Sequence, residues 1–280
     1  MSIGSAVILG LVQGLAEFLP ISSSGHLAIL QNLFNMSNFE DGHLFFDVLL
    51  HLGTLIAICF FYWGDIVKMF REVIEVLSGR ARIPDENGKR RRFGAARLFF
   101  LIVTATLPLV LILPVNGYIE LLSESTLFVG IALILTGFIL FAADRMTPGE
   151  KTEKNMSFKD ALIIGLCQCV AVLPGISRSG TTITAAIACG EKRSFAVKFS
   201  LLMSIPAVLG ATLVELVKAI KAGIDVSLIP AYLVGMAAAM ISGIFAIMLI
   251  RYIVTRGKFG GFSYYCWIVG ALTIVLTMIF

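Results

Sequence analysis

The first polar stretch of an otherwise apolar sequence carries side chains suited to metal binding. Gln13 and Glu17 are four residues apart, so on a helix they share one face. A carboxylate beside an amide oxygen suits Mg²⁺ or Ca²⁺, because both ions prefer oxygen ligands. The alternative for this pair is a hydrogen bond that only helps helices to pack. Glu17 and Gln13 are therefore the candidate metal ligands.

The residues after this pair suit anion binding and proton transfer. Pro20 should end the first helix. A new helix N-terminus should follow, and such a terminus attracts anions through hydroxyl and backbone N–H groups, here those of Ser22, Ser23, Ser24 and Gly25. His26 comes next, and a neutral imidazole accepts a proton near pH 7. The alternative for His26 is a buried histidine without a chemical role.

The second polar stretch centres on Arg178. An arginine at membrane depth is costly unless it meets an anion, and its planar guanidinium binds phosphate through two parallel hydrogen bonds. The alternative is a structural ion pair between Arg178 and Glu17. Small residues around the arginine add hydrogen-bond donors without bulk: Ser177, Ser179, Gly180, Thr181 and Thr182.

Composition excludes most other classes of protein. Of the 280 residues, 58% are hydrophobic and 14% charged, whereas soluble domains are nearer half apolar and a quarter charged. The net charge of +4 is too small to indicate a nucleic-acid partner. We therefore predict an all-α integral membrane protein that forms a single membrane domain over residues 1–280.

Eight apolar stretches can be recognised. Six read as plain crossings, at residues 44–63, 98–115, 127–143, 199–217, 229–250 and 262–280. The other two, residues 3–30 and 161–189, contain the polar stretches described above. Irregular backbone is tolerated at membrane depth only where it is buried in protein or lines a water-filled cavity. We therefore expect these two stretches to form broken-helix hairpins inside the bundle.

The two broken stretches are copies of each other. Shifting the first by 155 positions aligns them without a gap and gives ten identities between Ala6 and Gly25. Gln13 then matches Gln168, and Ser22 matches Ser177. Three plain crossings follow each copy, so we infer two repeats, residues 1–144 and 145–280.

The charge pattern predicts how the chain crosses the membrane. No Lys or Arg precedes Lys68, and nine lie between Lys68 and Arg97, which marks residues 68–97 as cytoplasmic. The same reasoning places residues 145–159 inside and the loop around Glu124 outside. Counting crossings makes both hairpins re-entrant from opposite faces, with tips meeting near the midplane. This is an inverted-topology repeat, although it assigns Lys218 and Lys221 to the outside.

Together these motifs resemble the undecaprenyl pyrophosphate phosphatase family, also called the bacitracin resistance protein family. The resemblance rests on Gln13-x-x-x-Glu17, Ser-Ser-Ser-Gly-His at 22–26, Pro-Gly-Ile-Ser-Arg-Ser-Gly at 174–180, and residues 46–53. It implies hydrolysis of undecaprenyl diphosphate to the monophosphate and inorganic phosphate with a divalent cation, which recycles the lipid carrier of cell-wall synthesis. It also implies the bacterial cytoplasmic (inner) membrane, an active site open to the outer, periplasmic side, and bacitracin as a competitor for the substrate. The essential residues it implies are Glu17, Ser23, His26 and Arg178.

Two functions fit these residues. In a hydrolase, the attacking group is Ser23 activated by His26, or a water molecule activated by His26. A prenyl-phosphate flippase would use the same arginine and hydroxyls, since inverted repeats with broken helices are common in transporters. Asp47 and His51, four residues apart, form a further candidate pair beside the site.

Overall fold

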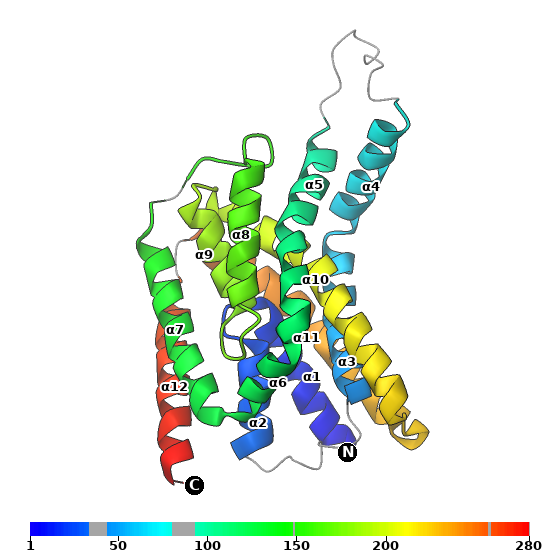
Figure 1. Cartoon of the computed structure of the whole chain (residues 1–280), viewed down its shortest axis with the longest axis vertical. Coiled ribbons are helices and arrows are strands. Elements are labelled where there is room, and N and C mark those ends of the chain that lie inside the picture. The colour runs from blue at the N-terminus through cyan, green and yellow to red at the C-terminus, as the bar shows by residue number, and fades with distance from the viewer. Residues whose placement is uncertain (34–43, 80–92, 148, 257–258, 280) are drawn as a thin grey trace.

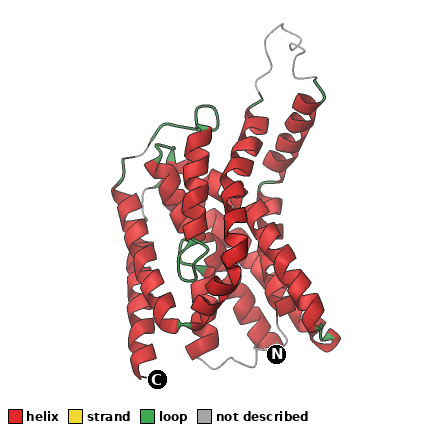
Figure 2. Ribbon diagram, viewed as in Figure 1, coloured by secondary structure: helices red, strands yellow, loops and turns green. Residues whose placement is uncertain are grey.

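The computed structural model describes residues 1–33, 44–79, 93–147, 149–256 and 259–279, which form helices and no β-strand (Figures 1 and 2). Six segments of this part are long and apolar enough to cross a membrane, which confirms the predicted class. They are α3 (Leu44–Phe61), α5 with the 3₁₀ helix η2 (Gly94–Thr106 and Leu107–Val115), α7 (Thr126–Arg145), α10 (Arg193–Ala222), η3 with α11 (Val226–Leu228 and Ile229–Thr255) and α12 (Gly260–Ile279).

The two broken stretches each form a helical hairpin. The first consists of α1 (Ile3–Phe18) and α2 (Ser23–Leu33), and the second of α8 (Phe158–Val170) and α9 (Arg178–Ala188). The hairpins open toward opposite ends of the bundle, with α1 and α2 in the lower half and α8 and α9 in the upper half of Figure 1. Their tips touch, because the Ser179 hydroxyl donates to the Leu19 carbonyl over 3.2 Å. Re-entry from opposite membrane faces stays a prediction.

Two segments differ from the sequence prediction. The segment at 68–97, which we predicted to be a cytoplasmic loop, starts within an amphipathic helix, α4 (Trp63–Leu77). The Glu72 side chain on this helix caps α5, because it accepts from the backbone N–H groups of Ala95 and Ala96 at 2.8 and 3.0 Å. The predicted crossing at 98–115 changes to 3₁₀ geometry at Leu107, next to Pro108, which has no backbone N–H to continue the α-helical hydrogen bonds. The basic run at 90–92 lies outside the described residues.

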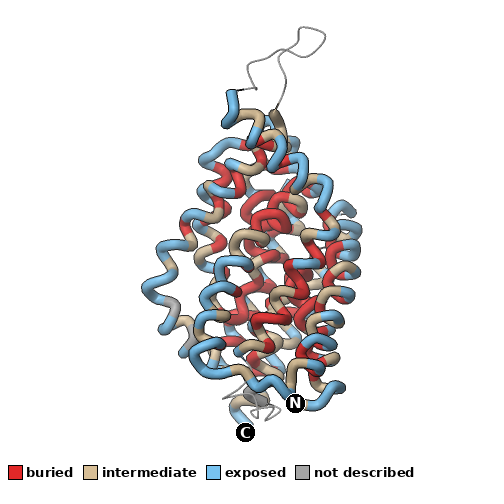
Figure 3. The backbone as a smooth tube through the Cα atoms, turned by 90° about the vertical axis from the view of Figure 1, so that its right-hand side faces the viewer, coloured by how far each residue is buried: buried red, intermediate tan, exposed pale blue. Residues whose placement is uncertain are grey.

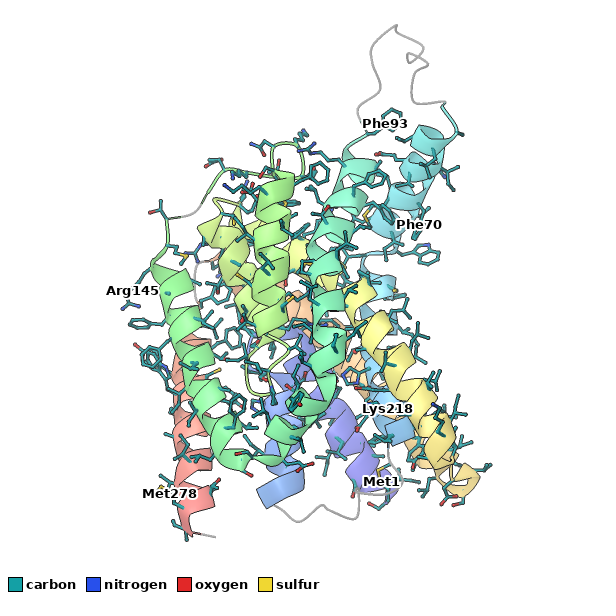
Figure 4. The ribbon with its side chains drawn as sticks, viewed as in Figure 1. Met1, Phe70, Phe93, Arg145, Lys218 and Met278 are labelled. Atoms are coloured by element: carbon teal, nitrogen blue, oxygen red, sulfur yellow. The ribbon has the colours of Figure 1, made fainter. Side chains whose placement is uncertain are left out.

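Segments with the same predicted side lie at the same end of the bundle. Arg97 donates to the carbonyl of Met156 at 2.7 Å, and Lys198 forms an ion pair with Asp65. Figure 4 places Phe93 and Arg145 toward this end, and Met1, Lys218 and Met278 toward the other. The segments around Arg97 and Met156, both predicted to lie inside, are therefore side by side. The inverted topology and the membrane face that each end occupies stay predictions.

The helices pack closely inside and present apolar side chains outside. Figure 3 shows buried residues along the middle of the bundle and exposed ones around it. Each hairpin crosses a long helix at a glycine: a Cβ atom at Gly10 would lie 2.3 Å from the Gly235 carbonyl oxygen, and one at Gly165 would lie 2.3 Å from that of Ala105. Since Gly10 and Gly165 are equivalent in the two repeats, α1 on α11 and α8 on α5 are matching contacts. Small residues at helix crossings are typical of membrane bundles.

Candidate active site

A cavity of about 540 Å³ opens beside the tips of the two hairpins. Its polar wall includes seven of the predicted site residues: Glu17, Ser22, Ser23, Ser24, Ser177, Arg178 and Ser179. Its apolar wall comes mainly from η2, through residues such as Leu109 and Leu113, and from α10, through residues such as Val208 and Val214. The cavity therefore combines a polar end with an apolar side.

Glu17 is the centre of the polar wall. Glu17 is the second-to-last residue of α1 and is 6% exposed. Its Oε1 atom accepts from a guanidinium N–H of Arg178, and its Oε2 atom accepts from the Ser23 hydroxyl at 2.8 Å and from the Gln13 amide at 3.1 Å. Glu17 thus joins the two hairpins through an ion pair and holds the serine hydroxyl at the same time.

The two hairpin tips are built alike. Ser22 precedes α2, and its hydroxyl accepts from Gly25 N–H at 3.2 Å. Ser177 caps α9, and its hydroxyl accepts from Gly180 N–H at 3.1 Å. The capping serines contact the hydroxyls of Ser24 and Ser179, at 3.3 Å in each case.

Both tips present a helix N-terminus to the cavity. The first residues of α2 and α9 are Ser23 and Arg178, and both line the cavity. The partial positive charge at a helix N-terminus favours an anion. Ser22 has a φ of +68°, a left-handed conformation that is uncommon for serine and marks a strained tip. The arrangement therefore suits an anion, and it also contains a carboxylate.

His26 lies on α2, away from Ser23. Its Nδ1 atom donates to the Ser22 carbonyl at 2.7 Å, so in the neutral ring Nε2 is the acceptor, and it accepts from the Tyr265 hydroxyl at 2.8 Å. The ring also stacks on that of Tyr265, with centroids 5.6 Å apart. The expected hydrogen bond between Ser23 and His26 is absent from the described residues, and the role of His26 as a base stays a prediction.

Other predicted phosphate-binding residues support the tips from behind. Thr182 is buried, and its hydroxyl donates to the Arg178 carbonyl at 2.9 Å and contacts the Ser200 hydroxyl at 2.6 Å. Thr181 is also buried, and its hydroxyl has no partner among the described residues. Gly25 and Gly180 supply the capped N–H groups. Like Gln13 and His26, these four residues do not line the cavity.

Four further polar residues line the cavity: His51, Thr106, Gln168 and Glu215. Two of them could be noticed in the sequence, since His51 lies in the run at 46–53 and Gln168 matches Gln13 in the repeat. Glu215, a carboxylate within a predicted crossing, went unnoticed. His51 donates from Nδ1 to the Asp47 carbonyl at 2.9 Å, so its contact with Asp47 is to the backbone and leaves Nε2 without a described partner.

The residues present fit a divalent cation that is held partly by the substrate. The side-chain oxygen of Gln13 is buried without a partner, next to the Glu17 carboxylate. The described residues contain no cluster of three or more His, Cys, Asp or Glu side chains suited to a metal. Mg²⁺ commonly binds through one or two carboxylates together with substrate phosphates and water. One carboxylate and one free amide oxygen match that mode better than a cage made only of protein atoms.

Fold and site together define a helical membrane protein with an internal cavity whose wall is polar at one end and apolar along one side. A family model described as bacitracin resistance protein BacA matches residues 6–272. The undecaprenyl-diphosphatase of Methanosphaera stadtmanae is 38% identical over all of this chain and 99% of its own length. Those of Alkaliphilus metalliredigens and Carboxydothermus hydrogenoformans are 39% and 41% identical, over 100% and 97% of this chain and 100% and 96% of their own lengths. The chain belongs to the bacitracin resistance protein family, which confirms the resemblance seen in the motifs.

Proposed function

We propose that this protein hydrolyses undecaprenyl diphosphate to undecaprenyl phosphate and inorganic phosphate. The observation that carries the proposal is the Arg178 guanidinium placed with two helix N-termini in one cavity, beside the carboxylate of Glu17. Phosphoryl transfer depends mainly on positioning and on neutralising charge, and these groups supply both. The full-length match to undecaprenyl-diphosphatases supports the same reaction.

The shape of the cavity fits a lipid diphosphate. The diphosphate would lie at the hairpin tips, where its charge meets Arg178 and the serines. The prenyl chain would lie against the apolar wall formed by η2 and α10, many of whose side chains face outward, including Val110 (60% exposed) and Leu213 (54% exposed). A substrate with a polar head and an apolar tail is matched at both ends.

The reaction needs a nucleophile, a base and a stabilised leaving group. An oxygen nucleophile attacks the terminal phosphorus and the bridging P–O bond breaks. The prenyl monophosphate leaves with the bond electrons, and a base takes the nucleophile's proton. Ser23 and a water molecule are both candidate nucleophiles. Attack by Ser23 would form a phosphoserine, and a water molecule would then break its P–O bond to release inorganic phosphate and restore the hydroxyl. The Ser23 hydroxyl already donates to Glu17 Oε2 at 2.8 Å, so Glu17 is placed to take the proton of Ser23. Arg178 would stabilise the charge that develops on the phosphate oxygens.

A divalent cation, Mg²⁺ or Ca²⁺, completes this proposal. Glu17 and the free oxygen of Gln13 would hold it, and it would neutralise charge on the diphosphate. When Glu17 binds a cation, Arg178 becomes available to the substrate.

We also propose a place in the cell for this activity. The positive segments face the cytoplasm of a bacterial inner membrane, and the cavity opens to the outer side. The cavity lies at the hairpin tips and is lined by η2 and by residues 206–215 of α10, the part of that helix that leads toward Lys218. Release of the monophosphate would recycle the lipid carrier. Bacitracin would compete for the same diphosphate, so hydrolysis of that diphosphate would counter bacitracin.

A phosphate-release assay tests the proposed function. Purified protein in detergent receives undecaprenyl or farnesyl diphosphate with Mg²⁺, with Ca²⁺ or with excess EDTA. We expect phosphate release with a divalent cation, none with EDTA, and none from Glu17→Gln. Absence of release under every cation would reject the hydrolase and favour a lipid carrier, and full activity in EDTA would reject the cation.

A further inference from the structure

Gln168 on α8 is a buried amide without a hydrogen-bond partner. The residue is 1% exposed, and neither the Nε2 nor the Oε1 atom of its side chain forms a hydrogen bond with any described residue. Buried polar groups are normally paired, and an unpaired one destabilises the fold. The amide therefore calls for a partner that the protein chain does not supply.

The repeat explains why this partner is missing. In the first hairpin, the equivalent Gln13 amide donates to Glu17 Oε2 at 3.1 Å. The shift of 155 positions places Val172 where the first hairpin has Glu17. The second hairpin thus keeps the glutamine but has no carboxylate for it, so Gln168 cannot make the contact that Gln13 makes.

The position of Gln168 indicates the kind of partner. It lines the same cavity as Arg178, which begins the other helix of its hairpin. Beside the Glu17 and Glu215 carboxylates, the groups gathered there are cationic or hydrogen-bond donors: the guanidinium, the serine hydroxyls and two helix N-termini. An occupant that satisfies them is rich in acceptor oxygens, and such an occupant also accepts from an amide N–H.

We propose that Gln168 is a substrate-binding residue whose Nε2 atom donates a hydrogen bond to an oxygen of the diphosphate group. This inference rests on the proposed function. Gln168 makes and breaks no covalent bond. It would add a neutral donor from the second hairpin to the charged donor of Arg178, and so help to fix the orientation of the phosphate.

The variant Gln168→Met tests this role, because methionine keeps the length of the side chain and removes the amide. Without substrate, we expect an unchanged or higher Tm, since an unpartnered polar group has been removed. With substrate, we expect kcat/KM for phosphate release to fall about tenfold or more, mainly through KM. A structural role would change Tm downward instead. The matched control is Leu166→Met on the same helix, where the side chain is 49% exposed and both values should stay at the wild-type level.

Two results would overturn the proposal. One is Gln168→Met with wild-type kcat/KM, and the other is a lower Tm with unchanged KM, which would indicate a structural amide paired with a trapped water. If Gln168→Met does not fold, Gln168→Glu serves instead, and its added negative charge should raise KM further. A Gln168→Glu enzyme with wild-type KM would overturn the proposal as well.

A binding measurement distinguishes failure of this inference from failure of the proposed function. If the wild type releases no phosphate, the function fails, and the rise in Tm caused by undecaprenyl diphosphate becomes the measurement. A smaller rise for Gln168→Met than for the wild type would support the contact. An equal rise would overturn it, and no rise in the wild type would overturn both ideas.

Discussion

Replacing Arg178 with lysine should preserve the fold and cut kcat/KM for the diphosphate strongly. The arginine side chain is 23% exposed and the Glu17 side chain 4% exposed, so this ion pair is largely desolvated. Lysine keeps the positive charge near Glu17, and Tm should therefore change little. Lysine loses the planar fork that binds phosphate twice. Losing one charge-assisted hydrogen bond costs about 1.5–3 kcal/mol, which corresponds to a drop of roughly ten- to hundredfold in kcat/KM.

Arg178→Ala extends the same reasoning to stability. It leaves a buried carboxylate unpaired, which costs about 3–5 kcal/mol, and adding Glu17→Gln should restore most of that stability without restoring activity. The measurements are phosphate release and Tm in detergent. Arg251→Lys is the matched control, because Arg251 lies over the Phe61 ring, 5.1 Å from its centroid, and lines a different pocket. Wild-type efficiency in Arg178→Lys would refute the assignment of Arg178 to the phosphate.

Three other predictions concern the nucleophile, the topology and a buried acid. If Ser23 is the nucleophile, Ser23→Ala should abolish most turnover in a phosphate-release assay, and near-normal turnover would leave water as the attacking group. In a background without native cysteines, a membrane-impermeant thiol reagent added outside should label Ser123→Cys but not Asn155→Cys; labelling at Asn155 would contradict the inverted arrangement. Burial raises the pKa of Glu191 from 4.5 to about 7, so the folded state favours the neutral acid and stability should fall as pH rises from about 4.5 through 7. Glu191→Gln should therefore raise Tm at pH 8 more than at pH 5, and an equal change at both pH values would argue against a buried neutral acid.

The sequence predicted the class of fold and the two special hairpins well. Long apolar runs have few structural alternatives in a bilayer, so the crossings could be recognised from composition alone. The hairpins could be recognised because Pro20, Pro174 and the serine clusters interrupt such runs. Helix α4 was missed because its polar face made it read as a loop. The change to 3₁₀ geometry at Leu107 was missed because apolar composition hides the effect of Pro108.

The candidate site was predicted less completely than the fold. Glu17, Ser23 and Arg178 were expected to be close because an internal repeat places them at equivalent tips, and the structure brings them into contact. The partner of His26 was not predictable, because Tyr265 is 239 residues away in the chain. Glu215 joins the cavity through the packing of α10, and no local pattern in the sequence marks such a contact.

The two repeats have the same capping residues at their hairpin tips but contribute side chains of opposite charge to the site. Both tips have a capping serine and a second serine two residues later, so the two helix N-termini are capped in the same way. The positions that differ carry the chemistry: Glu17 stands where the second repeat has Val172, and Arg178 stands where the first has Ser23. Because Glu17 and Arg178 pair with each other, each offsets the charge of the other before substrate enters, which limits the cost of placing these two ions in an apolar bundle. A diphosphate must then compete with Glu17 for Arg178. A cation bound at Glu17 would favour the substrate in that competition, so metal binding and substrate binding should each strengthen the other.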